Sequence, residues 1–164
     1  MRRRAILAVT TCLLSLSVAG CAGGAKVREF TLIQTDTQIQ VNDLGPKGDS
    51  PGDEIDVVAK LSRDGQPAGY LTGYAHISKM PNAGGVDTGD RQVRVTQFSF
   101  NLPEGDLMIV GQGLYRVGER RVPVGEPVTR PVVGGTKDYI GARGEVISTW
   151  QPDGSHAQQF RLIS

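Results

Sequence analysis

Apolar and polar residues alternate along most of this chain. From residue 29 onward, runs with alternating β-branched and aromatic residues recur, and no window carries a sustained i, i+3, i+4 apolar stripe of an amphipathic helix. Between Glu54 and Ser62 the apolar positions share one face: Ile55, Val57, Ala59 and Leu61. This periodicity predicts an all-β domain.

Segments rich in Gly, Pro, Asp and Asn divide the alternating stretches. The predicted strands are 29–41, 54–62, 67–78, 91–102, 107–117, 128–133, 139–150 and 156–163. Asp64-Gly65 predicts a tight hairpin between the second and the third. In the fourth, the apolar positions shift parity between Val95 and Phe98, which predicts a β-bulge near Thr96 or Gln97.

Eight antiparallel strands without a covering helix favour a closed eight-stranded antiparallel β-barrel, because closure removes the sheet edges. A two-sheet sandwich is the alternative. The interior of such a barrel is just wide enough for packed side chains or one small ligand. Glycines at 141 and 144, after the Gly134-Gly135 turn, indicate a sharp bend or a close backbone approach, as expected at a barrel corner.

The first 20 residues have a different pattern. Arg2, Arg3 and Arg4 precede an apolar run over residues 5–18, which is shorter than the roughly 20 residues of a membrane-spanning helix. Val18-Ala19-Gly20-Cys21 then matches a bacterial lipobox. The sequence predicts a lipoprotein signal peptide over 1–20, acylation of Cys21 with palmitate-type chains, a tether within 21–28 and a barrel domain over 29–164. An ordinary secretory signal with an incidental cysteine is the alternative.

Processing changes composition and charge. Removal of residues 1–20 leaves 144 residues, and 15 basic against 17 acidic side chains give a formal charge of −2. No basic stripe suggests a nucleic-acid partner. Cys12 leaves with the signal, so no intramolecular disulfide is expected. The predicted location is the cell envelope, with the protein lipid-anchored on the extracytoplasmic side of a bacterial membrane.

Residues 134–144 (GGTKDYIGARG) resemble the GGTG-x-Tyr/Phe-x-Gly-Ala-Arg-Gly signature of the allene oxide cyclase barrel and dirigent-like group, with Lys137 in place of a glycine. The similarity spans roughly residues 30–163. It implies a lipocalin-like barrel that holds a small hydrophobic molecule, and relatives that form trimers or dimers make a homo-oligomer an expectation. It also implies candidate catalytic positions, namely Asn42 by analogy with a cyclase asparagine and Asp43, Asp138 and Arg143 by analogy with dirigent pockets. The cyclase carboxylate position falls on Gln40, which cannot act as a base.

Tyr70, Tyr74 and His76 share one strand face and are candidate ligand-binding residues if that face lines the interior. The opposite assignment directs Leu71, Ala75 and Ile77 inward, and periodicity does not decide between the two. Arg116, Glu119, Arg120 and Arg121 have the composition of an exposed turn.

No nucleophile elbow, metal-ligand spacing or dinucleotide fingerprint is present, so neither a cofactor nor a metal is expected. The sequence therefore favours a lipid-anchored barrel that binds a small apolar molecule. A cyclase or isomerase that steers a reactive intermediate is one alternative. A packed barrel that serves as an envelope interaction module is another.

Overall fold

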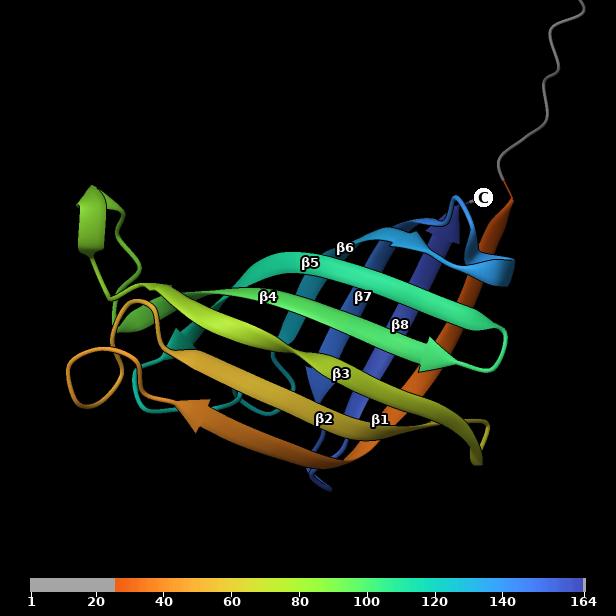
Figure 1. Cartoon of the computed structure of the whole chain (residues 1–164), viewed down its shortest axis with the longest axis horizontal. Coiled ribbons are helices and arrows are strands. Elements are labelled where there is room, and N and C mark those ends of the chain that lie inside the picture. Colours follow the sequence, from red (N-terminus) through yellow and green to blue (C-terminus); the bar gives the residue numbers. More distant parts are fainter. Residues whose placement is uncertain (1–25, 164) are drawn as a thin grey trace, which may run out of the picture.

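The computed structural model describes residues 26–163. Eight strands form a single closed barrel (Figure 1). They are β1 (Val27–Asn42), β2 (Glu54–Arg63), β3 (Gln66–Lys79), β4 (Arg91–Leu102), β5 (Gly105–Arg116), β6 (Pro127–Gly135), β7 (Arg143–Trp150) and β8 (His156–Ile163). Two short 3₁₀ turns, η1 (Ala83–Gly85) and η2 (Lys137–Tyr139), lie in the connections.

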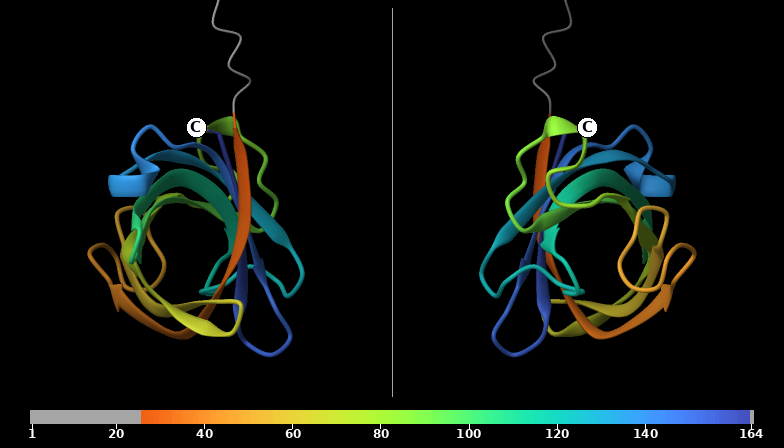
Figure 2. Two further views of the ribbon diagram at one scale, coloured as in Figure 1. Left: turned by 90° about the vertical axis from the view of Figure 1, so that its right-hand side faces the viewer. Right: turned by 90° about the vertical axis from the view of Figure 1, so that its left-hand side faces the viewer.

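The predicted eight-stranded antiparallel barrel is confirmed, and the sandwich is excluded. Every strand pairs with its neighbour in sequence, and β1 pairs with β8 from Val27↔Ile163 to Gln34↔His156, which closes the ring. The ring is visible end-on in Figure 2. The pairing is shortest between β5 and β6, where it covers only Leu107–Ile109 of β5.

The Asp64-Gly65 hairpin is confirmed. Arg63 pairs with Gln66 across a two-residue loop, and both loop residues have positive φ, 51° for Asp64 and 76° for Gly65. That conformation matches the right-handed twist of the flanking strands. The inward face predicted for β2 is confirmed as well, since Ile55, Ala59 and Leu61 are buried.

The bulge predicted in β4 is wrong. The register between β4 and β5 runs without interruption from Arg91↔Arg116 to Leu102↔Gly105. The strand keeps one parity throughout, and its inward positions in the first half are polar: Gln92, Arg94 and Thr96, all buried. Val93 and Val95 therefore face outward, and the hydrophobic pattern alone gave a false shift of face. Register shifts occur instead in β1, between Thr35 and Gln38, and in β3, between Ile77 and Lys79.

The last part of the glycine-rich segment also differs from the prediction. The strand expected from residue 139 begins at Arg143, because residues 137–139 form η2 and put the Tyr139 ring, 2% exposed, inside the barrel. Lys137 adopts φ 49°, in the left-handed region that a glycine would favour. The predicted close approach is confirmed at Gly144, with φ 139°, where a Cβ would lie 2.0 Å from the Arg161 carbonyl oxygen.

The barrel has two different ends. The closed end is where β1 begins, β8 ends and η2 carries Tyr139 (right-hand side of Figure 1). Its interior is an apolar cluster built around Leu32, Leu71, Phe100, Ile109 and Phe160, each at most 2% exposed. The opposite end is called the basic end after four arginines, Arg94, Arg120, Arg121 and Arg130. No helix among residues 26–163 is long and apolar enough to span a membrane.

Candidate ligand-binding cavity

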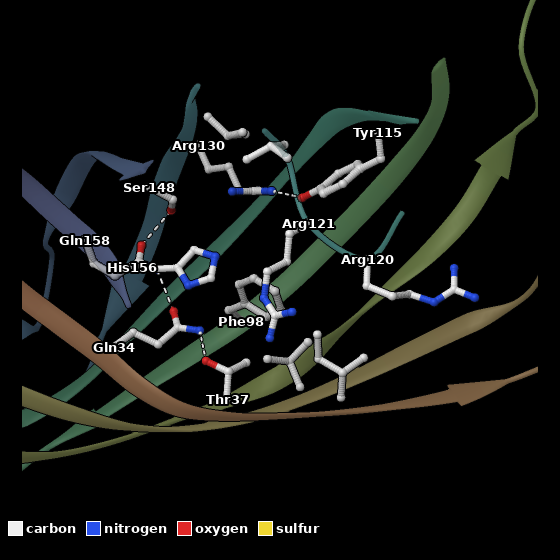
Figure 3. A pocket seen from close by; sticks show the side chains of 14 residues that line it. Gln34, Thr37, Phe98, Tyr115, Arg120, Arg121, Arg130, Ser148, His156 and Gln158 are labelled. Carbon is white, nitrogen blue, oxygen red and sulfur yellow. Dashed lines mark hydrogen bonds between the residues drawn. The ribbon is translucent and has the colours of Figure 1, made fainter. Parts of the chain in front are cut away.

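A cavity of about 80 Å³ lies inside the barrel at the basic end (Figure 3). Its lining comes from β1, β2, β4, β5, β6, β7 and β8 and from the loop between β5 and β6. The apolar part of the lining consists of Ile39, Val57, Phe98, Val122 and Val128. Space for one water needs about 10–15 Å³, so this cavity is large enough for several waters or for part of a compact organic molecule.

A chain of polar side chains separates the cavity from the apolar cluster of the closed end. The Ser148 hydroxyl donates to Gln158 Oε1 at 2.6 Å, Gln158 Nε2 donates to Gln34 Oε1 at 2.6 Å, and Gln34 Nε2 donates to Thr37 Oγ1 at 3.0 Å (Figure 3). Gln34 and Gln158 are buried. Because each amide has a partner, this chain forms a fixed floor for the cavity.

Arg130 is the most deeply buried charge in the lining, with 3% exposure. Its Nη2 donates to the Tyr115 hydroxyl at 2.7 Å, and its guanidinium lies 6.0 Å from the Phe98 ring centre. Two glycines of β5 make room for it: a Cβ at Gly111 would meet Arg130 Cγ at 3.1 Å, and one at Gly113 would meet the Tyr115 ring at 2.9 Å. The two glycines therefore allow the Arg130 and Tyr115 side chains to pack against β5.

Asp49 joins two loops at the mouth of the basic end. Its carboxylate accepts from Arg120 Nη1 at 2.9 Å, from the Gly118 amide at 2.8 Å and from Gln92 Nε2 at 2.9 Å. Arg94 Nη2 lies 3.8 Å away. Burial raises the pKa of Asp49, but these hydrogen bonds outweigh it, so the pKa of Asp49 lies below its ordinary value. The loop over 43–53 is thereby fixed to the loop over 117–126.

His156 and Arg121 lie on the same side of the cavity (Figure 3). The imidazole stacks on Trp150 with ring centres 6.3 Å apart, and its Nδ1 has no hydrogen-bond partner among residues 26–163. Burial, and secondarily the charge of Arg121, lower the pKa of His156 to about 4. His156 is therefore neutral at pH 7 and offers the cavity a hydrogen-bonding group without charge.

The structure places the predicted ligand-binding residues away from this cavity. Leu71, Ala75 and Ile77 form the buried, inward face of β3. Tyr70, Tyr74 and His76 occupy the alternate, outward positions, where Tyr70 is 53% exposed and the Tyr74 hydroxyl donates to Gln97 at the exposed surface. Periodicity left two assignments of the inward face of β3 open, and the structure selects the one with Leu71, Ala75 and Ile77 inside.

The four candidate catalytic residues lie at opposite ends of the barrel. Asn42 ends β1 and donates to Asp56 Oδ2 at 2.9 Å, and Asp43 accepts from the Gly48 amide at 3.1 Å in the following loop. Asp138, in η2, and Arg143, which pairs with Ile163 at the start of β7, are exposed at the closed end. The structure therefore does not bring these residues together, and none of them lines the cavity.

The side chains that do line the cavity were mostly missed. Val128, Arg130 and Val132 occupy alternate positions of β6 and share its inward face. A charged residue between two apolar residues of one face is the sequence signal that could have identified Arg130 as a cavity residue. Arg120 and Arg121 have the sequence context of an exposed turn, but both line the cavity. Sequence spacing could not show this, because the loop over 117–126 folds back over the mouth of the barrel.

The arrangement suits recognition of an organic molecule. Apolar side chains, a tyrosine hydroxyl, a neutral imidazole, one buried guanidinium group and two half-buried ones surround one space. Within residues 26–163, no group of three or more His, Cys, Asp and Glu side chains is placed to hold a metal ion.

Comparisons with known proteins reveal similar barrels at low sequence identity. A scan against protein-family models and a search of curated proteins gave no match. Among solved structures, one described as a pyocyanin demethylase is 23% identical, with a TM-score of 0.60 over 81% of this chain and 100% of that one. A nonspecific heme-binding cyclase that catalyses [4 + 2] cycloaddition during neoabyssomicin biosynthesis is 14% identical, with a TM-score of 0.61 over 86% of this chain and 68% of that one.

A third solved structure, the Diels Alderase AbmU from Streptomyces koyangensis, is 13% identical, with a TM-score of 0.59 over 85% of this chain and 63% of that one. These identities show a shared fold. The chain shares the barrel fold of these three proteins.

Proposed function

We propose that the protein binds a small, mainly apolar molecule in the cavity at the basic end of its barrel. The observation that carries the proposal is the cavity itself, with an apolar part of the lining that includes Val57 and Phe98 and a fixed polar floor. The closed half of the barrel is filled by side chains, so the basic half is where a ligand would be accommodated. The solved structures with this fold include proteins described as acting on small organic molecules, which supports the proposal.

Native mass spectrometry of the protein purified from its own host tests this function. A bound small molecule that is lost on denaturation supports it. Protein that carries no molecule, and that also fails to bind small apolar probes, would favour the packed envelope module instead.

We further propose that a lipid on Cys21 holds the protein on the extracytoplasmic side of a bacterial membrane. The predicted signal peptide and Cys21 lie outside the described residues. The chain enters the barrel at Val27, at the closed end, only six positions after Cys21. At about 3.3–3.6 Å per extended residue, this tether spans at most ~22 Å. The closed end would therefore face the bilayer, and the cavity would open toward the aqueous side.

The anchor has a direct test. Cys21→Ala should move the protein from the membrane fraction to the soluble extracytoplasmic fraction, because acyl chains provide the binding energy. Retention of the variant on membranes at high salt would contradict the lipoprotein proposal.

A cyclase or isomerase is the second candidate function. It is favoured by the cyclase and Diels Alderase among the structures with this fold and by Arg130, whose charge lies beside the apolar part of the lining. Such a site could fix the conformation of a reactive molecule and stabilise charge that develops on an oxygen. Incubation of the isolated ligand or its precursor with fresh protein, followed by chromatography, separates the two functions. A product isomer of unchanged mass indicates catalysis, whereas unchanged starting material indicates binding alone.

A further inference from the structure

Positive charge in the basic end exceeds negative charge. Arg94, Arg120, Arg121 and Arg130 converge there, and the carboxylate close to them is Asp49. Asp49 is already shared, with Arg120 at 2.9 Å and Arg94 at 3.8 Å. Among residues 26–163, no carboxylate oxygen lies within 4.0 Å of a side-chain nitrogen of Arg121 or Arg130. Two guanidinium groups of the cavity thus have no counter-ion from the described chain.

Such an arrangement is unfavourable for the empty protein. A buried charge without a counter-ion loses its hydration and destabilises the folded state. Arg130 is 3% exposed, and within residues 26–163 the buried Nε atoms of both Arg130 and Arg121 have no hydrogen-bond partner. The sequence provides space for these groups, since Gly111 and Gly113 leave open the volume next to Arg130 and Tyr115.

We propose that the ligand carries an anionic oxygen group, a carboxylate or an enolate, which is bound by Arg130 and Arg121 inside the barrel. This proposal rests on the proposed binding function and names the chemical class of its ligand. A guanidinium presents paired N–H donors that match the two oxygens of a carboxylate. The Tyr115 hydroxyl accepts from Arg130, so its own proton remains available to donate to the anion.

The rest of the cavity defines the other half of the ligand. Phe98, Val57 and Ile39 present a flat and aliphatic surface, and the volume of about 80 Å³ favours a compact ring over a long acyl chain. The ligand class is therefore a small aromatic or unsaturated acid with its charged end toward Arg130.

Calorimetric titration with benzoate and with benzamide, its neutral analogue of the same shape, tests the proposal at fixed ionic strength. The wild-type protein should bind benzoate about tenfold more tightly or better, as expected for a charge-assisted hydrogen bond to a buried partner. Arg130→Met keeps the aliphatic stem and removes the charge, so it should lower the affinity for benzoate to that for benzamide. Arg143→Met, with the same change at an exposed position of the closed end, should leave both affinities unchanged.

Arg121→Gln provides a second route if Arg130→Met does not fold, because Arg121 is only half-buried. It should weaken benzoate several-fold and benzamide hardly at all. Equal affinity of the wild type for the two probes, or equal weakening of both probes in the arginine variants, overturns the anion site and leaves the binding function intact. Binding of neither probe also overturns the anion site, and the native mass of the protein from its host then decides the binding function separately.

Discussion

The two halves of the barrel interior are built from the same strands but differ in the polarity of their inward side chains. At the closed end, the inward positions are mostly apolar and interlock, as shown by Phe100, which packs edge-on against Phe160 with ring centres 4.9 Å apart. One ion pair, between Arg63 and Glu104, lies beside this cluster. At the basic end, inward positions of the same strands carry Arg94, Thr96, Arg130 and Gln158. The first half supplies stability, because it removes apolar surface from water. The second buries polar side chains such as Gln92, Arg94 and Arg130, and such exceptions occur where function opposes stability.

The largest difference between the halves should appear on removal of an aromatic ring. Phe100 is 0% exposed in the apolar cluster, so Phe100→Ala should cost about 3–5 kcal/mol of unfolding free energy through lost burial and a new cavity. Phe98 lies two positions away on the same face, against the existing cavity. Phe98→Ala should cost clearly less. Chemical denaturation measures both, and equal losses would mean that the basic half is packed as tightly as the closed half.

The corner at the closed end should tolerate no side chain. A Cβ at Gly144 would lie 2.0 Å from the Arg161 carbonyl oxygen, so Gly144→Ala should lower the unfolding free energy by roughly 2 kcal/mol or more. Gly134, in the neighbouring β6, is the matched control, because a Cβ there meets nothing within 4 Å. A similar small shift in melting temperature for both variants would contradict the close approach of β7 and β8.

The basic half should be the more sensitive to acid. His156 titrates near 6.5 in the unfolded chain, whereas burial, and then Arg121, lower its folded-state pKa to about 4. Its neutral form is therefore favoured by folding. This contribution is complete above pH 6.5 and is lost as the pH falls from 6.5 toward 4.

Melting temperatures at pH 7 and pH 5 measure this effect. The decrease between the two should be smaller for His156→Gln than for the wild type. His76→Gln, on the outward face of β3, should behave as the wild type. If His156→Gln loses as much stability as the wild type, the imidazole is not held neutral by burial.

The smallest effect concerns a single hydroxyl. Thr96 is 0% exposed and its Oγ1 has no hydrogen-bond partner in the described part of the chain, so Thr96→Val replaces an unsatisfied polar atom by a methyl group of the same shape. The unfolding free energy should stay the same or rise by up to about 1 kcal/mol. A loss of more than about 1 kcal/mol would show that the hydroxyl has a partner, such as an internal water.

The sequence by itself determined the eight strands, their antiparallel order and the turns between them. These features follow from local chemistry: Asp64 and Gly65 adopt positive φ in a two-residue loop, and alternate apolar residues of β2 identify its inner face. The resemblance to the allene oxide cyclase barrels pointed to the same architecture. Its candidate catalytic residues did not converge, because Asn42 and Arg143 lie at opposite ends of the barrel.

Only the tertiary structure decided which residues form the cavity. Periodicity identifies an inner face by its apolar residues, so it failed in β4, where Gln92, Arg94 and Thr96 point inward, and it left β3 undecided. The cavity also depends on contacts between residues distant in sequence. Asp49 fixes Arg120 from 71 positions away, and Gln158 donates to Gln34 across 124 positions. Closure of the barrel creates these contacts. The local sequence does not predict them, because a polar residue that a distant strand buries looks the same in the sequence as a polar residue exposed to water.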